Sequence, residues 1–382
     1  MHGTFHIYIP ALKPHPFRFG IRHPMAGLML VLLLVSCRKT PEPITPATPE
    51  KLMVPGHGAY TGAYIDAGDN EDEVTATAID DFEKLVGKRE AIIASSSYWG
   101  EQNFPADNLE LIHQHGSIPL VYWSPWDAPY EEGDGPDRFS LDSILAGKWN
   151  DYIDAWADSA KQFGHPLFVS FAKEPNGSGF PWSGMYCGAD KPVPNTTPVQ
   201  YEGPETYKKA YRYVVDRVRA KGAANIIWVF EVMNFSIPQD EWNYINQYYP
   251  GAGYVDWIGL SIYGQEYPDQ SWSDFTPLLQ QPYAEVARMA PDKPIMIAEL
   301  RCGEFPKSGS KSNFITDAFA TVEKNYPQLK AAIFWNEQWQ NEDDSTSDLR
   351  ANSSPESLEA YRKGIGGAFW LDHPVYATAG RP

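Results

Sequence analysis

The sequence predicts a single closed barrel of eight parallel strands, each followed by a helix, which is the (β/α)8 or TIM-barrel class of α/β fold. From Gly56 onward, short apolar runs rich in β-branched and aromatic residues alternate with helical patterns. The chain of 382 residues is long enough for one such domain. An open, doubly wound sheet would need a glycine-rich nucleotide loop after its first strand, and the sequence has none there.

The expected strands are the runs in which apolar residues dominate. They are Ala59–Ile65, Glu90–Ser95, Pro119–Trp123, Leu167–Ala172, Asn225–Phe230, Asp256–Ile262, Pro294–Leu300 and Ala331–Trp335. Between them, large apolar side chains recur at helical spacing in Lys148–Phe163 and in Pro204–Lys221. Pro355–Gly364 is the expected last helix, which closes the ring.

Residues 1–37 have the pattern of a lipoprotein signal peptide. Lys13, Arg18 and Arg22 precede the apolar run Met25–Val35, which is too short to span a bilayer but has the length of a signal-peptide core. The run leads into Leu-Val-Ser-Cys, which resembles the lipobox where bacterial lipoproteins are cleaved and acylated, here on Cys37. The alternatives are an ordinary signal peptide cut nearby and a true start at Met25.

Three further segments complete the expected organisation. Residues 38–55 carry proline at every second or third place and predict an extended tether. The barrel is expected over residues 56–370, with a tail at 371–382. We therefore expect an exported monomer that is lipid-anchored to a bacterial membrane through Cys37, facing the periplasm or the cell surface.

The composition argues against nucleic acid as a partner, but it does not decide whether the cysteines form a disulfide. The 49 acidic and 31 basic residues give a net charge of −18, which argues against nucleic acid because phosphate binding needs a positive surface. The aromatic content of 14% suits either a large core or sugar stacking. Cys187 and Cys302 either pair in an oxidising compartment or remain two free thiols.

The candidate site follows from the fold, because catalytic groups of such barrels lie at the C-terminal ends of the strands. The polar and aromatic residues expected there are Asp66, Trp126, Asp127, Lys173, Glu174, Asn176, Glu231, Tyr263, Glu299, Trp335, Asn336 and Glu337. Carboxylates and aromatics dominate, and no histidine stands at a strand end. A metal-dependent hydrolase is therefore not expected, and the acidic loop at 66–73 does not match the spacing of a calcium-binding loop.

Glu174 and Glu299 are the expected catalytic pair. They follow the fourth and seventh strands, which lie across the barrel mouth from each other. Glycoside hydrolysis needs two such carboxyl groups and no cofactor. Retaining enzymes place the two groups about 5–5.5 Å apart, and inverting enzymes about 6.5–9.5 Å.

Several motifs resemble glycoside hydrolase family 26 over about residues 57–370. They are a Gly-X-Tyr near the start, Phe-Ala-Lys-Glu-Pro-Asn-Gly at 171–177, Tyr-Val-Asp-Trp-Ile-Gly-Leu-Ser-Ile-Tyr-Gly at 254–264 and Pro-Ile-Met-Ile-Ala-Glu-Leu at 294–300. The resemblance implies that Glu174 is the acid/base and Glu299 the nucleophile. It also implies that Tyr263 orients the nucleophile and that Trp335 forms the platform under the sugar at the cleavage point.

Lys173 departs from the family pattern, because mannan-cleaving members usually place histidine before the acid/base and the wider clan often places asparagine there. A cation beside Glu174 could donate a hydrogen bond to a sugar hydroxyl, but at close range it would lower the pKa of the acid. A general acid works best with a raised pKa. Lys173 is therefore expected either to point away from Glu174 or to be offset by burial.

Other residues are expected to touch substrate without taking part in the chemistry. Asn176, Trp182 and Trp339 are the predicted sugar contacts, with Trp182 on the long loop after Glu174. Glu231 is expected to bind a sugar hydroxyl or to pair with a base rather than to act directly.

These residues predict a retaining endo-β-glycanase that cleaves β-1,4-mannan. Two alternatives stay open: a glucanase or xylanase with the same chemistry, and a non-catalytic glycan-binding lipoprotein. The presence of both strand-end glutamates argues against the binding protein, and Lys173 is the feature in its favour.

Overall fold

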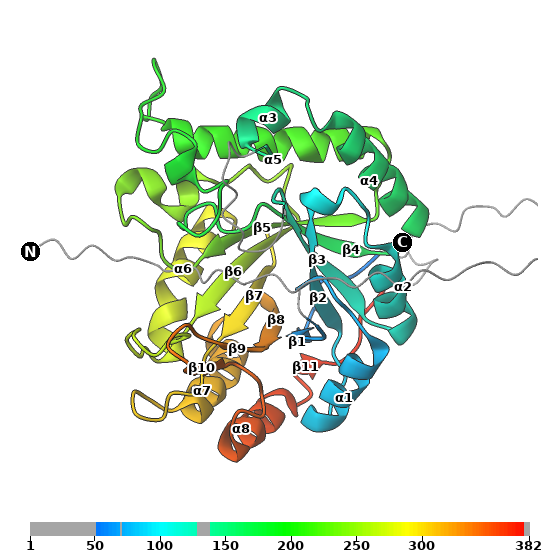
Figure 1. The fold of residues 1–382 in the computed structure, drawn as a ribbon, viewed down its shortest axis with the longest axis vertical. Helices are drawn as coiled ribbons and strands as arrows, with labels where there is room; N and C mark the ends of the chain where they lie inside the picture. The colour runs from blue at the N-terminus through cyan, green and yellow to red at the C-terminus, as the bar shows by residue number, and fades with distance from the viewer. Residues whose placement is uncertain (1–50, 69–70, 128–137, 378–382) are drawn as a thin grey trace, which may run out of the picture. The chain divides into compact units, whose positions relative to one another are not determined.

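The computed structural model describes residues 51–68, 71–127 and 138–377. The predictions for the signal peptide, for Cys37 and for most of the tether lie outside the described residues. Within them, β1 to β8 pair in sequence order and β1 also pairs with β8, so the parallel sheet closes into a barrel. Helices surround the strands (Figure 1). The predicted (β/α)8 class is confirmed.

The strands of the barrel are β1 (Ala59–Ile65), β2 (Ile92–Tyr98), β3 (Ile118–Ser124), β4 (Leu167–Phe171), β5 (Ile226–Met233), β6 (Trp257–Tyr263), β7 (Ile295–Arg301) and β8 (Leu329–Asn336). The α-helices are α1 (Ala76–Val86), α2 (Ala106–His115), α3 (Leu141–Leu145), α4 (Asn150–Phe163), α5 (Glu202–Ala220), α6 (Phe275–Met289), α7 (Lys311–Asn325) and α8 (Pro355–Ile365). Short strands β9 (Gln338–Gln340) and β10 (Thr346–Asp348) form a hairpin, and β11 (Trp370–Leu371) pairs with β1.

Local sequence explains where the helices begin and end. The hydroxyl of Thr75 accepts a hydrogen bond from the amide of Ala78 at the start of α1, and Gly87 ends that helix in the left-handed conformation. Ser354 caps α8 in the same way, and Pro355 occupies its first turn, where the missing amide hydrogen has no intrahelical partner to lose.

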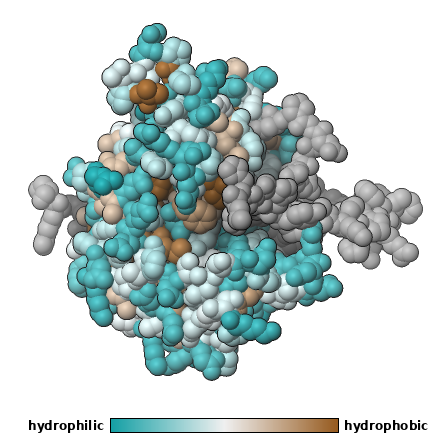
Figure 2. Space-filling view, turned by 90° about the vertical axis from the view of Figure 1, so that its left-hand side faces the viewer, coloured by the Kyte–Doolittle hydropathy of each residue, from teal (hydrophilic) through white to brown (hydrophobic). Residues whose placement is uncertain are grey.

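Apolar side chains form two separate cores because successive strand residues point to opposite faces of the sheet. One core fills the barrel and includes Phe168, Val229 and Met296. The larger core lies between the strands and the helices. Most of the face shown in Figure 2 is hydrophilic, with apolar side chains visible in small patches. No helix among the described residues is long and apolar enough to cross a membrane.

The structure corrects several element boundaries. β5 runs to Met233 rather than ending at Phe230, so Glu231 lies within the strand. The hairpin β9–β10 and strand β11 were not predicted. Leu52 pairs with Tyr376, so the folded body extends beyond both predicted limits of the barrel. No disulfide joins Cys187 to Cys302, so the predicted alternative of a bridge between these two cysteines is wrong.

Candidate active site

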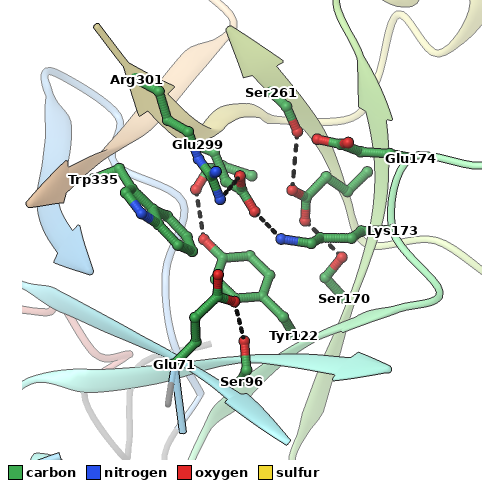
Figure 3. Close-up of polar contacts among 12 residues, drawn as sticks. Glu71, Ser96, Tyr122, Ser170, Lys173, Glu174, Ser261, Glu299, Arg301 and Trp335 are labelled. Atoms are coloured by element: carbon green, nitrogen blue, oxygen red, sulfur yellow. Dashed lines mark hydrogen bonds and ion pairs between the residues drawn. The ribbon is translucent and has the colours of Figure 1, made fainter. Parts of the chain in front are cut away.

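Three glutamates from neighbouring parts of the barrel mouth meet in one buried cluster. Glu174 follows β4, Glu231 lies in β5 and Glu299 lies in β7. One carboxylate oxygen of each lies within 4.8 Å of the others. Their exposed fractions are 5%, 1% and 0%, respectively. Figure 3 shows the side chains around this cluster pointing toward one another.

An irregularity in β7 turns Glu299 into the barrel. The register of β6 against β7 shifts so that Leu260 pairs with Ile297 but Ser261 pairs with Glu299, which passes over Ala298. An extra residue in a strand re-aims the side chain that follows it. The hydroxyl of Tyr122 donates a hydrogen bond to the carbonyl of Ala298 at 2.7 Å, and this contact holds the bulge in place.

The backbone after β4 places Glu174 by a different device. Ala172 and Glu174 both have positive φ angles, of 48° and 57°. Side chains other than glycine rarely adopt this region, so the surrounding structure must hold it. The amide of Glu174 donates to the carbonyl of Glu231 at 3.0 Å, which ties the turn to β5.

Glu299 is the ionised carboxylate of the cluster. Lys173 contacts its Oε1, and Arg301 lies 2.7 Å from its Oε2. Burial alone would raise the pKa of Glu299, but Arg301, Lys173 and Tyr263 outweigh burial and lower it. An ionised carboxylate is the state that a nucleophile needs.

Tyr263 links the two predicted catalytic groups. Its hydroxyl lies 2.6 Å from Glu299 Oε2 and also contacts Glu174 Oε1. A phenol has a single hydrogen to donate. Because Glu299 is the charged partner, Tyr263 donates to Glu299, and protonated Glu174 donates to the oxygen of Tyr263.

The electrostatics of Glu174 agree with this assignment. Burial and the charge on Glu299 raise its pKa, while Lys173 acts in the opposite direction. A general acid must be protonated and a nucleophile must be ionised, so the two carboxyl groups need pKa values that differ in this way. Both carboxylates contact one hydroxyl, and the 4.8 Å limit on their oxygens is far shorter than the spacing of about 6.5–9.5 Å in inverting enzymes.

Lys173 points toward the nucleophile rather than toward open solvent. Its ammonium lies 4.4 Å from the ring centre of Tyr122, 5.4 Å from that of Trp335 and 5.7 Å from that of Phe180. Glu299, Glu71 and Glu231 offset burial and raise its pKa, so it remains charged. The described residues that are close enough together to hold a metal are the three glutamates, but Lys173 already supplies a cation to Glu299.

Trp335 is covered on its faces in this structure, and its predicted role as a sugar platform stays a prediction. Tyr64 stacks on it at 3.9 Å, and the guanidinium of Arg301 lies 3.7 Å from its ring centre. Its exposed fraction is 0%. A sugar ring could therefore stack on Trp335 only after Arg301 moved.

Two other residues predicted to contact sugar are buried in this structure, and their predicted role stays a prediction. Asn176 is fully buried, and its side-chain amide bonds both the amide and the carbonyl of Met233. Trp182 is 1% exposed and donates to the carbonyl of Lys173 at 2.7 Å. Both residues hold the loop after β4 in place. Trp339, on β9, is half-buried and packs near Tyr267 at 5.6 Å, so its prediction as a sugar contact stands untested.

Sequence reasoning missed several groups that face the glutamates. Arg301 stands two residues after Glu299 on the same strand, so the alternation of side chains could have indicated it. The same rule applied to β4 and β6 would have found Ser170 and Ser261, whose hydroxyls donate to Glu231 at 2.6 Å and 3.2 Å. No signal in the sequence indicated Tyr122.

Two adjoining cavities lead away from the cluster. One, of about 10 Å³, is lined by Glu71, Ser96, Tyr98, Ser124, Trp126, Lys173 and Phe180. The other, of about 260 Å³, also includes Ser96 and is lined mainly by polar side chains at the end of β2 and the start of α2. The hydroxyl, amide and carboxylate groups that line the larger cavity suit the hydroxyl groups of a glycan.

Comparisons with known proteins agree with this geometry. The family described as glycosyl hydrolase family 26 matches residues 138–331. The chain is 30% identical over 314 residues to Endoglucanase H of Acetivibrio thermocellus, covering 81% of this chain and 30% of that protein. It is 24% identical over 247 residues to a mannan endo-1,4-beta-mannosidase of Bacillus subtilis, covering 64% of this chain and 58% of the relative.

Solved structures support the fold alone. The catalytic domain of the endo-beta-1,4-mannanase from Bacillus sp. JAMB-750 matches with a TM-score of 0.58 at 19% identity, over 83% of this chain and 88% of that one. A beta-mannanase from a symbiotic protist of the termite Reticulitermes speratus, solved with a gluco-manno-oligosaccharide, matches with a TM-score of 0.52 at 19% identity, over 82% and 88% of the two chains. The chain spans less than two thirds of the length of the two sequence relatives named above.

Proposed function

The chain belongs to glycosyl hydrolase family 26, and on this basis we propose that it is a retaining endo-β-glycanase that cleaves β-1,4-mannan. The observation that carries the proposal is the pair formed by Glu174 and Glu299. One is buried with a raised pKa, the other is buried with a lowered pKa, and both contact the hydroxyl of Tyr263.

The proposed reaction proceeds in two displacements. Glu299 attacks the anomeric carbon while Glu174 gives its proton to the departing glycosidic oxygen, which yields a covalent glycosyl-enzyme. Glu174, now ionised, then takes a proton from water as that water attacks the same carbon and releases Glu299. Two inversions leave the configuration of the sugar unchanged.

Tyr263 and the two cations support the first displacement. Lys173 and Arg301 hold both oxygens of Glu299 in the charged state. When Glu174 loses its proton and Glu299 becomes an ester, Tyr263 can donate its hydrogen to the ionised Glu174, which it also contacts. Fixed donors of this kind cost little reorganisation during the reaction.

Mannan is favoured as substrate by three relatives whose names describe mannan endo-1,4-beta-mannosidases. A β-glucan is the second candidate, because the relative with 30% identity is named Endoglucanase H and because Lys173 stands where mannan-cleaving members usually place histidine. Xylan is a weaker candidate, supported by relatives named beta-1,3-xylanase that match over 35% of the chain.

A panel of polysaccharides tests the substrate proposal. Purified protein should release reducing ends from β-1,4-mannan faster than from mixed-linkage β-glucan, and from both faster than from xylan. Oligosaccharides of several lengths should appear early, because an endo-acting enzyme cuts within the polymer. A preference for β-glucan would replace the mannan assignment, and binding to a glycan without release of any product would favour the glycan-binding protein.

We also propose that the protein is an exported lipoprotein anchored through Cys37. The support is the basic flank, the short apolar run and the Leu-Val-Ser-Cys sequence. Growth of a bacterial host with a labelled fatty acid should place label on the wild-type protein and none on Cys37→Ser. Equal labelling of the two proteins would exclude acylation at Cys37.

A further inference from the structure

Glu231 is a third carboxyl in the catalytic cluster, and the two-glutamate mechanism has no step for it. It lies in β5 with 1% of its surface exposed. One of its oxygens lies within 4.8 Å of oxygens of both Glu174 and Glu299. Burial and the two neighbouring acids raise the free energy of ionising a third carboxyl group at this position. Its presence therefore needs an explanation.

The surroundings of Glu231 favour its ionised form over that of Glu174. Ser170 donates to its Oε2 at 2.6 Å, and Ser261 donates to its Oε1 at 3.2 Å. Hydrogen bonds donated to a carboxylate stabilise its charge. The hydrogen of Tyr263 is used by Glu299, and Ser261 also hydrogen-bonds Glu174 and lowers its pKa. Ser170 is therefore the donor that favours the charge of Glu231 over that of Glu174. A proton shared by Glu174 and Glu231 therefore resides on Glu174.

Lys173 provides the reason for a third acid. Its charge acts on Glu174 in the direction that removes the proton of the general acid. A charged Glu231 raises the pKa of Glu174, which is the opposite of the effect of Lys173. Glu231 is also one of the acids that raise the pKa of Lys173 and keep it charged.

We propose that Glu231 is a positioning residue whose carboxylate offsets the charge of Lys173 and thereby keeps the proton on Glu174. The inference rests on the proposed function of Glu174 as general acid. The two carboxyls titrate as a pair, since each disfavours ionisation of the other. Burial, Glu299 and Glu174 raise the pKa of Glu231 to about 8, while Lys173 and Ser170 act to lower it. Because a protonated Glu174 carries no charge, Glu231 ionises more readily while Glu174 keeps its proton.

Other charged groups face the pair and remain in place in the proposed tests. They are Glu299 and Arg301 on β7, Tyr263 on β6, Tyr122 on β3, Glu266 after β6 and Glu71 after β1. Their contributions are common to wild type and variants. The comparison therefore isolates the effects of Glu231 and Lys173.

Glu231→Gln should move the alkaline limb of kcat/KM for the glycan to lower pH by roughly one unit, because Glu174 then loses its proton more easily. Lys173→Met should move the same limb to higher pH, and the double variant should return it toward the wild-type position. Ser170→Ala should move the limb in the direction of Glu231→Gln by a smaller amount, because it weakens the charged form of Glu231 without removing the carboxyl.

Glu90→Gln is the matched control. Glu90 is also a buried glutamate, 1% exposed, and burial raises its pKa to about 8. It precedes β2 at the end of the barrel away from the site and contacts Tyr361 of α8. This variant should leave the alkaline limb where it is in wild type.

A second measurement follows the proton whether or not a glycan is cleaved. The protein is labelled with ¹³C at the glutamate side-chain carboxyl, and the signal of Glu174 is assigned by its loss in Glu174→Gln. Its pKa should fall in Glu231→Gln and rise in Lys173→Met. Unchanged Glu174 titration in both variants would overturn the inference about Glu231, whereas a protein that shows these shifts but cleaves no glycan would overturn the proposed function instead.

Discussion

Glu299→Ala is expected to abolish turnover of the glycan and of an activated aryl glycoside alike, with rates lower by on the order of 10⁴-fold or more. The reason is that no covalent glycosyl-enzyme can form without this carboxylate. An activated leaving group does not help, because leaving-group departure is not the step that is lost. The measurement is kcat/KM on both substrates, with Glu90→Gln as a variant that should keep wild-type values.

Added azide sharpens this prediction. In the space left by the Glu299 side chain, azide can attack the anomeric carbon once, from the face that Glu299 used. The product should therefore be a glycosyl azide of inverted configuration. Loss of activity accompanied by unfolding would be uninformative, so thermal unfolding of Glu299→Ala and of the closer isostere Glu299→Gln is measured alongside. Glu299→Ala turnover close to that of wild type would remove Glu299 as nucleophile.

Glu174→Ala is expected to separate the two kinds of substrate. Hydrolysis of the glycan should fall by about 10²- to 10⁴-fold, because its departing oxygen needs the proton that Glu174 supplies. Formation of the glycosyl-enzyme from an activated aryl glycoside should be far less affected, because that leaving group departs without protonation. The measurement compares kcat/KM for the two substrates and the burst of released aryl alcohol.

The second displacement gives Glu174→Ala its own signature. Water attacks slowly without the base, whereas azide needs no base and should accelerate turnover of the intermediate. Because azide then performs the second of two inversions, the glycosyl azide should retain the configuration of the substrate, opposite to the product of Glu299→Ala. Equal behaviour of Glu174→Ala and Glu299→Ala on the aryl glycoside, with no azide effect, would contradict this division of roles.

The meeting of Glu174 and Glu299 could be predicted from the sequence because a barrel brings its strand ends together whatever the loops do. Glu174 and Glu299 each follow an apolar run of strand length, so their meeting depends only on the fold. Tyr263 was predictable from the same rule, at the end of β6. The orientation of Lys173 was not, because it depends on two residues of positive φ that no local pattern indicates.

The sequence did not indicate which of the predicted site residues are covered. Trp335 is covered by Tyr64 from β1 and by Arg301 from β7, and Trp182 is anchored by the carbonyl of Lys173. Such contacts join residues far apart in the sequence, so composition and periodicity do not reveal them. Glu231 was assigned to a strand end because β5 was drawn three residues too short, and the continuation of its alternation places the carboxyl inside the barrel.

The configuration of the first sugar product tests the central claim most directly. Proton NMR of the wild-type reaction with β-1,4-mannan, recorded before mutarotation, follows the anomeric signal of the newly formed reducing end. The β anomer should appear first and the α anomer later, because two displacements at the same carbon, carried out by Glu299 and then by water, retain configuration. Initial release of the α anomer would show a single displacement and contradict the assignment of Glu299 as nucleophile.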